Sequence, residues 1–174
     1  MFKFSLLTAF FILSLQFSYS QDSDYRFSHL DITNGLTDNR VNCIVKDSQG
    51  FIWFGTTAGL SRYDGYEFKN FSHNVTDPHS LFSNSVVKIY EGPNDKLWVY
   101  TNNGMNIYDP NSERFSNDIS EELYQYHIHG KKIISIKKDK TGNFWFLTKN
   151  EGVFYYNPKN KFTFQYNTIQ GVGI

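Results

Sequence analysis

Three tryptophans at nearly equal intervals constrain this chain more than any other feature. Trp53, Trp98 and Trp145 stand 45 and 47 residues apart, and each begins W-x-x-T, with a glycine six or seven residues later and a tyrosine ten or eleven later. Three copies in one register over about 120 residues indicate a repeat protein. The repeat positions, for which we expect a structural role, are Trp53, Thr56, Gly59, Tyr63, Trp98, Thr101, Gly104, Tyr108, Trp145, Thr148, Gly152 and Tyr156.

Each repeat has the pattern of short strands. In the first copy, apolar runs cover residues 41–45, 51–56 and 60–63, and turn residues such as Asp64-Gly65 separate them. Such runs, rich in Val, Ile, Phe, Tyr and Trp, are typical of antiparallel strands joined by hairpins. Four strands in about 45 residues make a propeller blade. We therefore predict an all-β fold of β-propeller blades, each of about four antiparallel strands, and no helical periodicity past residue 25.

The blade also gives the tryptophan a role. A large flat side chain at a fixed strand position fills the wedge between neighbouring blades, where its burial contributes roughly 2–3 kcal/mol. About three blades are present, whereas a closed ring takes four to eight. The sequence thus predicts an incomplete ring, the opening portion of a longer design that is either a truncated gene or a fragment.

The repeat divides the chain into segments. We expect a signal peptide over 1–20, a lead-in strand over 21–34, propeller blade 1 over 35–80, blade 2 over 81–128 and blade 3 over 129–166. Residues 167–174 are expected to start a truncated fourth blade. The first segment has one early charge, Lys3, an apolar stretch from Phe4 to Phe17, and small residues before Gln21, which is typical of a secretory signal peptide. This predicts a periplasmic protein.

Charge and cysteine content exclude some functions. Lysine plus arginine and aspartate plus glutamate both total 17, so no nucleic acid is expected to bind this segment. Cys43 is the only cysteine, which rules out an intramolecular disulfide and favours a small buried side chain. The turn aspartates follow the repeat and are explained by turn hydrogen bonds.

Candidate site residues are few. His127 and His129 have the spacing of two ligands on one strand face and are weak metal candidates, although Tyr124 to His129 reads equally well as an alternating surface strand. The aromatic residues Tyr66, Phe71, Phe82 and Tyr124 are weak candidates for stacking on sugar rings. No catalytic residue, metal or cofactor is predicted.

The first repeat resembles a known family. Gly35-Leu36-Thr37, Asp47-Ser48-Gln49-Gly50-Phe51-Ile52-Trp53-Phe54-Gly55-Thr56 and Gly59-Leu60-Ser61-Arg62-Tyr63-Asp64-Gly65 are similar to the first blade of the two-component regulator propellers, the periplasmic sensor halves of hybrid histidine kinases of Bacteroidetes. The second copy departs from the pattern, because Gly92 replaces the turn aspartate and Asp95 stands where a glycine is expected.

The resemblance implies an exported sensor that responds to oligosaccharides and signals to transcription. Family members continue into further blades, one transmembrane helix and a kinase, so this N-terminal fragment alone should neither bind ATP nor transfer phosphate, and should meet a membrane only through its missing C-terminal part. Its expected partners are the remaining blades of a longer chain or another copy, and an oligosaccharide. Two alternatives remain open: a structural or interaction remnant that docks to another chain, and a fragment of a propeller lyase or hydrolase.

Overall fold

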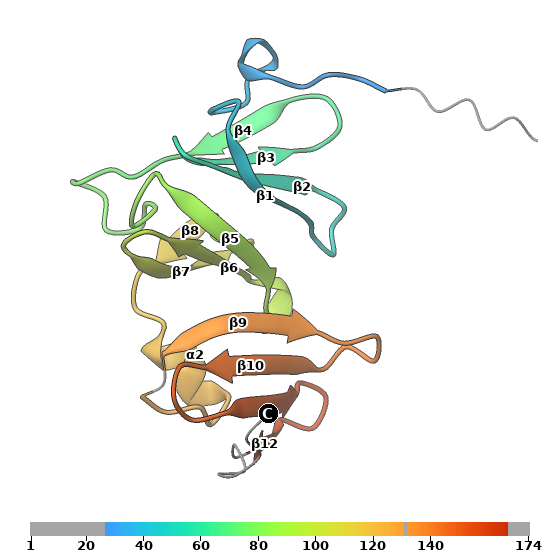
Figure 1. The fold of residues 1–174 in the computed structure, drawn as a ribbon, viewed down its shortest axis with the longest axis vertical. Coiled ribbons are helices and arrows are strands. Elements are labelled where there is room, and N and C mark those ends of the chain that lie inside the picture. Colours follow the sequence, from blue (N-terminus) through green and yellow to red (C-terminus); the bar gives the residue numbers. More distant parts are fainter. Residues whose placement is uncertain (1–26, 131, 167–174) are drawn as a thin grey trace, which may run out of the picture.

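The described part of the computed structural model, residues 27–130 and 132–166, consists of three four-stranded antiparallel sheets (Figure 1). The predicted signal peptide and the predicted start of a fourth blade lie outside these residues. The strands are β1 (Val41–Lys46), β2 (Ile52–Thr56), β3 (Leu60–Tyr63), β4 (Phe68–Phe71), β5 (Val86–Glu91), β6 (Leu97–Thr101), β7 (Gly104–Asp109), β8 (Arg114–Ser116), β9 (Ile133–Lys138), β10 (Phe144–Thr148), β11 (Val153–Asn157) and β12 (Phe162–Tyr166).

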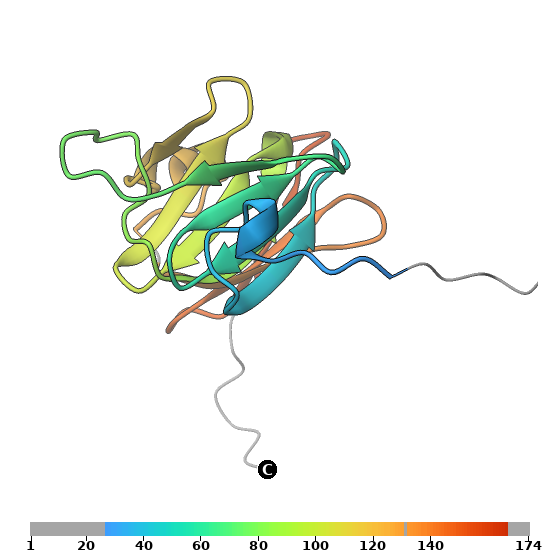
Figure 2. The same ribbon diagram turned by 90° about the horizontal axis from the view of Figure 1, so that it is seen from above.

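Each sheet is one blade, and the blades stack face to face. Within each sheet the strands follow chain order, as consecutive hairpins require. The first strands lie side by side, because β1 contacts β5 and β5 contacts β9, and Figures 1 and 2 show the sheets fanning out from that side. The predicted fold class is confirmed: the chain is all-β, and its described residues form three blades without a closed ring.

One hydrogen bond explains the threonine and the glycine of the repeat. At the end of the second strand of every blade, the threonine Oγ1 donates to the carbonyl of the glycine that opens the next strand. The three bonds, each 2.9 Å long, are Thr56 to Gly59, Thr101 to Gly104 and Thr148 to Gly152. All three glycines have positive φ, a conformation that costs other residues about 1–2 kcal/mol. The pair therefore fixes the hairpin of each blade.

The core lies between the blades. Trp53 belongs to a buried cluster with residues of blade 2, and its ring lies 4.9 Å from that of Tyr108. Trp98 belongs to the next cluster, between blades 2 and 3, and its ring lies 5.8 Å from that of Phe146. Both tryptophans are fully buried, whereas Trp145 is only partly buried and packs on Tyr155 and Tyr166 of its own blade.

A further apolar repeat position escaped the sequence analysis. Leu36, Leu81 and Ile128 each stand five residues before the first strand of their blade, and all three are buried. Leu81 joins the cluster between blades 1 and 2, and Ile128 joins the one between blades 2 and 3. These residues lie in loops with no strand periodicity, so only their constant distance from the next strand could have revealed them.

Two expectations about secondary structure need correction. The described part of the predicted lead-in strand, residues 27–34, holds a 3₁₀ turn, η2 (Ile32–Asn34), instead of a strand. The reason is local: Asp31 Oδ1 accepts Thr33 N–H at 2.7 Å, and Asn34 Oδ1 accepts Asp31 N–H at 3.0 Å, which forms a capping box.

The second correction is α2 (Ser120–Gln125), a helix in a region where no helical periodicity was found. One and a half turns are too short to show a period of 3.6 residues, and tertiary packing of Leu123 stabilises the helix instead. The stretch from Tyr124 to His129 is therefore no strand. Within the residues that the structure describes, no helix has the length and apolar character needed to cross a membrane.

Candidate functional site

Blade 2 departs from the other blades at the turn before its tryptophan. In blades 1 and 3, an aspartate six residues before the tryptophan accepts the indole N–H. The two pairs are Asp47 Oδ2 with Trp53 Nε1 at 2.7 Å, and Asp139 Oδ2 with Trp145 Nε1 at 3.2 Å. Blade 2 has Gly92 at this position, and Trp98 Nε1 is buried without a hydrogen-bond partner among the described residues. An unpaired buried donor costs about 1–3 kcal/mol.

The same turn carries backbone strain. It contains the 3₁₀ segment η3 (Pro93–Asp95), in which Asn94 and Asp95 have φ of 59° and 57°. The turn reaches across to blade 1, where Ser48 Oγ donates to Asp95 Oδ1 at 2.8 Å. Strained residues and unsatisfied buried groups cluster at functional sites, so this turn marks a candidate position in the molecule.

The helix α2 is the second departure from the repeat. It lies between blades 2 and 3 and begins after Asp118, whose Oδ1 accepts Ser120 N–H at 2.9 Å. Tyr126, just after the helix, is 1% exposed, and its hydroxyl donates to Glu122 Oε2 at 2.9 Å. Buried contacts thus fix the helix, with Glu121 and Glu122 in its first turn.

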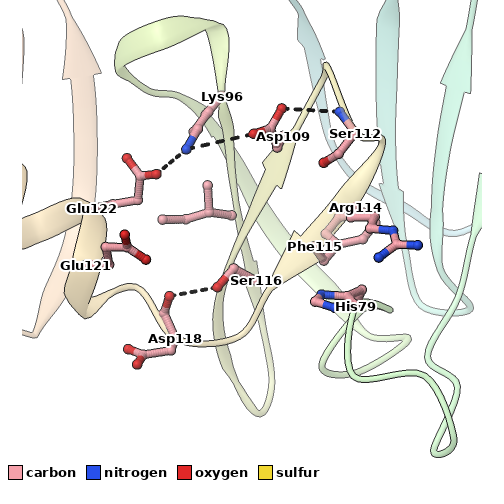
Figure 3. A pocket seen from close by; sticks show the side chains of 11 residues that line it. His79, Lys96, Asp109, Ser112, Arg114, Phe115, Ser116, Asp118, Glu121 and Glu122 are labelled. Atoms are coloured by element: carbon pink, nitrogen blue, oxygen red, sulfur yellow. Dashed lines mark hydrogen bonds and ion pairs between the residues drawn. The ribbon is translucent and has the colours of Figure 1, made fainter.

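The two departures meet in one cavity of about 250 Å³ between β8 and α2 (Figure 3). Lys96, which ends the strained turn, pairs with Glu122 of the helix and lies 4.0 Å from Asp109 Oδ2. Figure 3 shows Glu121, Glu122 and Asp118 on one side of the cavity, and Arg114 and His79 on the other. The residues that line the cavity are His79, Lys96, Ile107, Asp109, Ser112, Arg114, Phe115, Ser116, Asp118, Glu121 and Glu122.

A second cavity adjoins the first on the other side of β8. It has a volume of about 460 Å³, lies between β8 and the loop after β4, and shares four lining residues with the first: His79, Ser112, Arg114 and Phe115. Its edge is held by an ion cluster across the blades, in which Glu113 pairs with Arg62 at 2.9 Å and with Lys69. We call the two cavities together the β8 groove.

Charges in the groove are set by these contacts. The hydrogen bond from Lys69 and that from Arg62 lower the pKa of the Glu113 carboxyl. Backbone and side-chain hydrogen bonds from Ser120 lower the pKa of the Asp118 carboxyl. Both groups are therefore ionised at neutral pH. The arrangement offers charged and polar groups for recognition of a ligand.

The aromatic candidates from the sequence lie apart from one another. Tyr66 is 95% exposed in the turn between β3 and β4, and Tyr124 is 70% exposed on α2, with its ring 4.8 Å from that of His129. Phe82 covers Gly104 at the hairpin of blade 2. Phe71 packs between Trp53 and Phe115, at rings 5.7 and 5.6 Å away, and it alone of the four lines the β8 groove.

His127 and His129 do not lie on a strand. His127 has a φ of 57° in the turn after α2, and its ring centroid lies 6.3 Å from that of His129. Both side chains are exposed because the residues on either side of His127, Tyr126 and Ile128, are buried. Among the described residues, no group of three His, Cys, Asp or Glu side chains is placed to hold a metal ion.

Lys96, Arg114, Glu121 and Glu122 were missed by the sequence analysis. They come from the turn before β6, from β8 and from α2, and only the packing of blade 2 against α2 brings them together. One signal was present in the sequence, since Gly92 replaces the aspartate that the other repeats have at this position.

Comparison with known proteins locates the repeat in a family. Residues 35–58 match the family described as "Two component regulator propeller". A histidine kinase of Formosa agariphila is 33% identical over 76 residues. The match covers 44% of this chain and 5% of the kinase, so this chain spans a small part of that relative's length.

A solved structure shares the arrangement of blades. It is the extracellular domain of a protein described as a hybrid two component system from B. thetaiotaomicron, with a TM-score of 0.55 and 26% identity. The alignment covers 80% of this chain and 20% of that one. The matched repeat and the matched fold together confirm the resemblance: residues 35–58 carry the repeat of the two-component regulator propellers, and the blades are arranged as in that extracellular domain.

Proposed function

We propose that this chain is the N-terminal part of the ligand-sensing propeller of a two-component regulatory system, that it acts in the periplasm, and that its input is an oligosaccharide. The observation that carries the proposal is the similarity of its blades to an extracellular domain of a hybrid two-component system. The family repeat at residues 35–58 supports it. In this role the chain binds the ligand and transmits the signal, and it catalyses no reaction itself.

The ligand part of the proposal is tested with the 174-residue chain as it stands. Its thermal unfolding is measured alone and with each member of a panel of purified di- to hexasaccharides. A ligand that binds only the folded state raises Tm in proportion to the logarithm of its concentration. We expect one or more saccharides to do so. If none shifts Tm at millimolar concentration, the oligosaccharide role is wrong.

The export part is tested separately. The gene is expressed with its first 20 residues in a Gram-negative host, and the periplasmic fraction is sequenced from its N-terminus. We expect a mature chain that begins near Gln21. A product that stays in the cytoplasm with its N-terminus intact would contradict the periplasmic assignment.

The partner that we propose for blade 3 is another blade. The face that carries its tryptophan, the Trp face of blade 3, consists of Trp145, Leu147, Tyr155, Phe164 and Tyr166, which β-strand register places on one side. Leu147, Phe164 and Tyr166 are 40–50% exposed there. The corresponding faces of blades 1 and 2 are buried against the blade that follows. Remaining blades of a longer chain, or another copy, fit this surface.

A further inference from the structure

We infer that the β8 groove is the ligand site, and that it binds one short, uncharged saccharide across Arg114. The inference rests on the proposed function and goes beyond it, because it names the residues and the charge of the ligand. It begins from an observation independent of the family: both departures from the repeat contribute to this cavity, the strained turn through its last residue, Lys96, and α2 through Glu121 and Glu122.

The chemistry of the groove suits hydroxyl groups. A sugar hydroxyl both donates and accepts, and the two sides of the first cavity provide both kinds of partner. Asp118 and Glu121 supply carboxylate acceptors on one side, and Arg114 supplies a donor on the other, with its guanidinium pointing away from those carboxylates (Figure 3). Ile107 and Phe115 form the apolar floor of the cavity, where each is 2% exposed and so offers a sugar ring only a small contact area. Such sites combine apolar walls with a few placed polar groups.

Some of the charged side chains in the groove already form ion pairs, and others do not. Lys96 is held by Glu122 and Asp109, and Glu113 is held by Arg62 and Lys69. Arg114 and Glu121, by contrast, have no ion pair within 4.0 Å among the described residues, although carboxylates and cations surround them. Among the described residues, the groove thus presents an unpaired guanidinium on β8, that of Arg114, and an unpaired carboxylate on α2, that of Glu121.

Charge decides the class of saccharide. Four carboxylates line the first cavity, whereas its permanent cations are Lys96 and Arg114. The lining is therefore net negative, and it repels uronate or sulfate groups on a ligand. An uncharged sugar has no such repulsion to overcome.

The volumes of the two cavities limit the length of the ligand. The first cavity, at about 250 Å³, lies below the range of roughly 300–1,000 Å³ typical of sites for drug-sized ligands, so it suits one sugar ring. The adjoining cavity of about 460 Å³ provides space for a second ring on the other side of Arg114. The ligand that fits the β8 groove is therefore a disaccharide or a short oligosaccharide.

The test measures the dissociation constant of the full chain for matched saccharides by isothermal titration calorimetry. The neutral probes are cellobiose, maltose, xylobiose and galactobiose. Digalacturonate is the charged counterpart of galactobiose. The groove variants are Arg114→Gln and Glu121→Gln. Their matched controls are Arg40→Gln and Glu67→Gln, which change exposed residues of the same type that do not line either cavity. Circular dichroism verifies that every variant is folded.

We expect at least one neutral disaccharide to bind, and each groove variant to weaken its binding at least about tenfold, since each variant loses a hydrogen bond to a charged group. The controls should bind within about twofold of the unchanged chain. Binding that persists in both groove variants overturns this site but leaves the proposed function standing. Binding of digalacturonate tighter than galactobiose overturns the charge argument. Failure of every saccharide, in this titration and in the wider Tm panel, removes the proposed function as well.

Discussion

The aspartate six residues before the tryptophan, in blades 1 and 3, shows how one side chain can hold a whole turn. Asp47 Oδ1 accepts two backbone N–H groups, from Gln49 at 3.0 Å and Phe51 at 2.9 Å, while Oδ2 accepts the indole N–H of Trp53. In blade 3, the hydrogen bond from Thr141 is the largest of the contacts that lower the pKa of the Asp139 carboxyl. A carboxylate therefore serves the turn and the core together.

Asp47→Asn tests this arrangement. The amide keeps the acceptor for the backbone but turns a donor toward the indole N–H, so we expect a loss of about 1–3 kcal/mol in the free energy of unfolding. Urea denaturation measures the loss. The Trp53→Phe substitution removes the indole N–H donor. In that background, Asp47→Asn should therefore lower the free energy of unfolding by less. An equal cost in both backgrounds would show that the indole contact contributes nothing.

Tyr108 makes stability depend on alkaline pH. Burial is the main cause that raises the pKa of its phenol to about 12, compared with an ordinary value of about 10. Because the folded state holds this proton more tightly, the contribution to stability is complete below pH 10 and falls as the pH rises from about 10 to 12.

We expect the urea midpoint of the unchanged chain to drop between about pH 10 and pH 12, and to drop less in Tyr108→Phe. Tyr66→Phe is the control, since Tyr66 is 95% exposed. If the control and Tyr108→Phe lose the same amount over this range, the titration does not come from Tyr108.

At the scale of the element, a hairpin can require glycine for two separate reasons, backbone conformation and close contact. Gly59 and Gly65 both have positive φ, at 145° and 104°, but only Gly59 has a close neighbour. A Cβ at Gly59 would lie 2.7 Å from the carbonyl oxygen of Phe71, whereas a Cβ at Gly65 would meet nothing within 4 Å. The pair separates backbone strain from steric contact.

Gly65→Ala should therefore cost only the strain, about 1–2 kcal/mol, and Gly59→Ala should cost clearly more, because the third and fourth strands of the blade must also move apart. Thermal unfolding of both variants side by side provides the measurement. Similar losses of stability in the two variants would mean that the backbone at Gly59 shifts to accommodate the added Cβ at little cost.

At the scale of the whole molecule, the Trp face of blade 3 is an apolar sheet face that is left uncovered in the described structure. Large exposed apolar patches on a sheet lead to association. We expect the chain to associate in a concentration-dependent way, and Phe164→Lys with Tyr166→Lys to suppress the association in sedimentation velocity. Substitution of Lys159 by Glu, in a turn away from this face, is the control. An unchanged chain that is monomeric at high concentration and unfolds cooperatively would contradict this expectation.

The sequence by itself determined the blade. Alternating short apolar runs, W-x-x-T and a glycine at a fixed distance are local signals, and the hydrogen bonds that use them are local too, such as Thr56 to Gly59. The helix α2 and the turn η2 could not be read in this way, because they are too short for a period and depend on capping and on packing. The burial of Leu36, Leu81 and Ile128 could not be predicted from strand alternation either, because these residues lie in loops.

Only the tertiary structure decided the candidate site. Lys96 ends the turn before β6, whereas Arg114 and Glu121 belong to β8 and α2, and nothing in their sequence spacing requires that they line one cavity. The packing of blade 2 against α2 brings them together, because burial of Leu123 and Tyr126 fixes the helix beside the strained turn. The repeat sets what is common to the blades, whereas contacts between residues far apart in sequence create the one place where blade 2 differs.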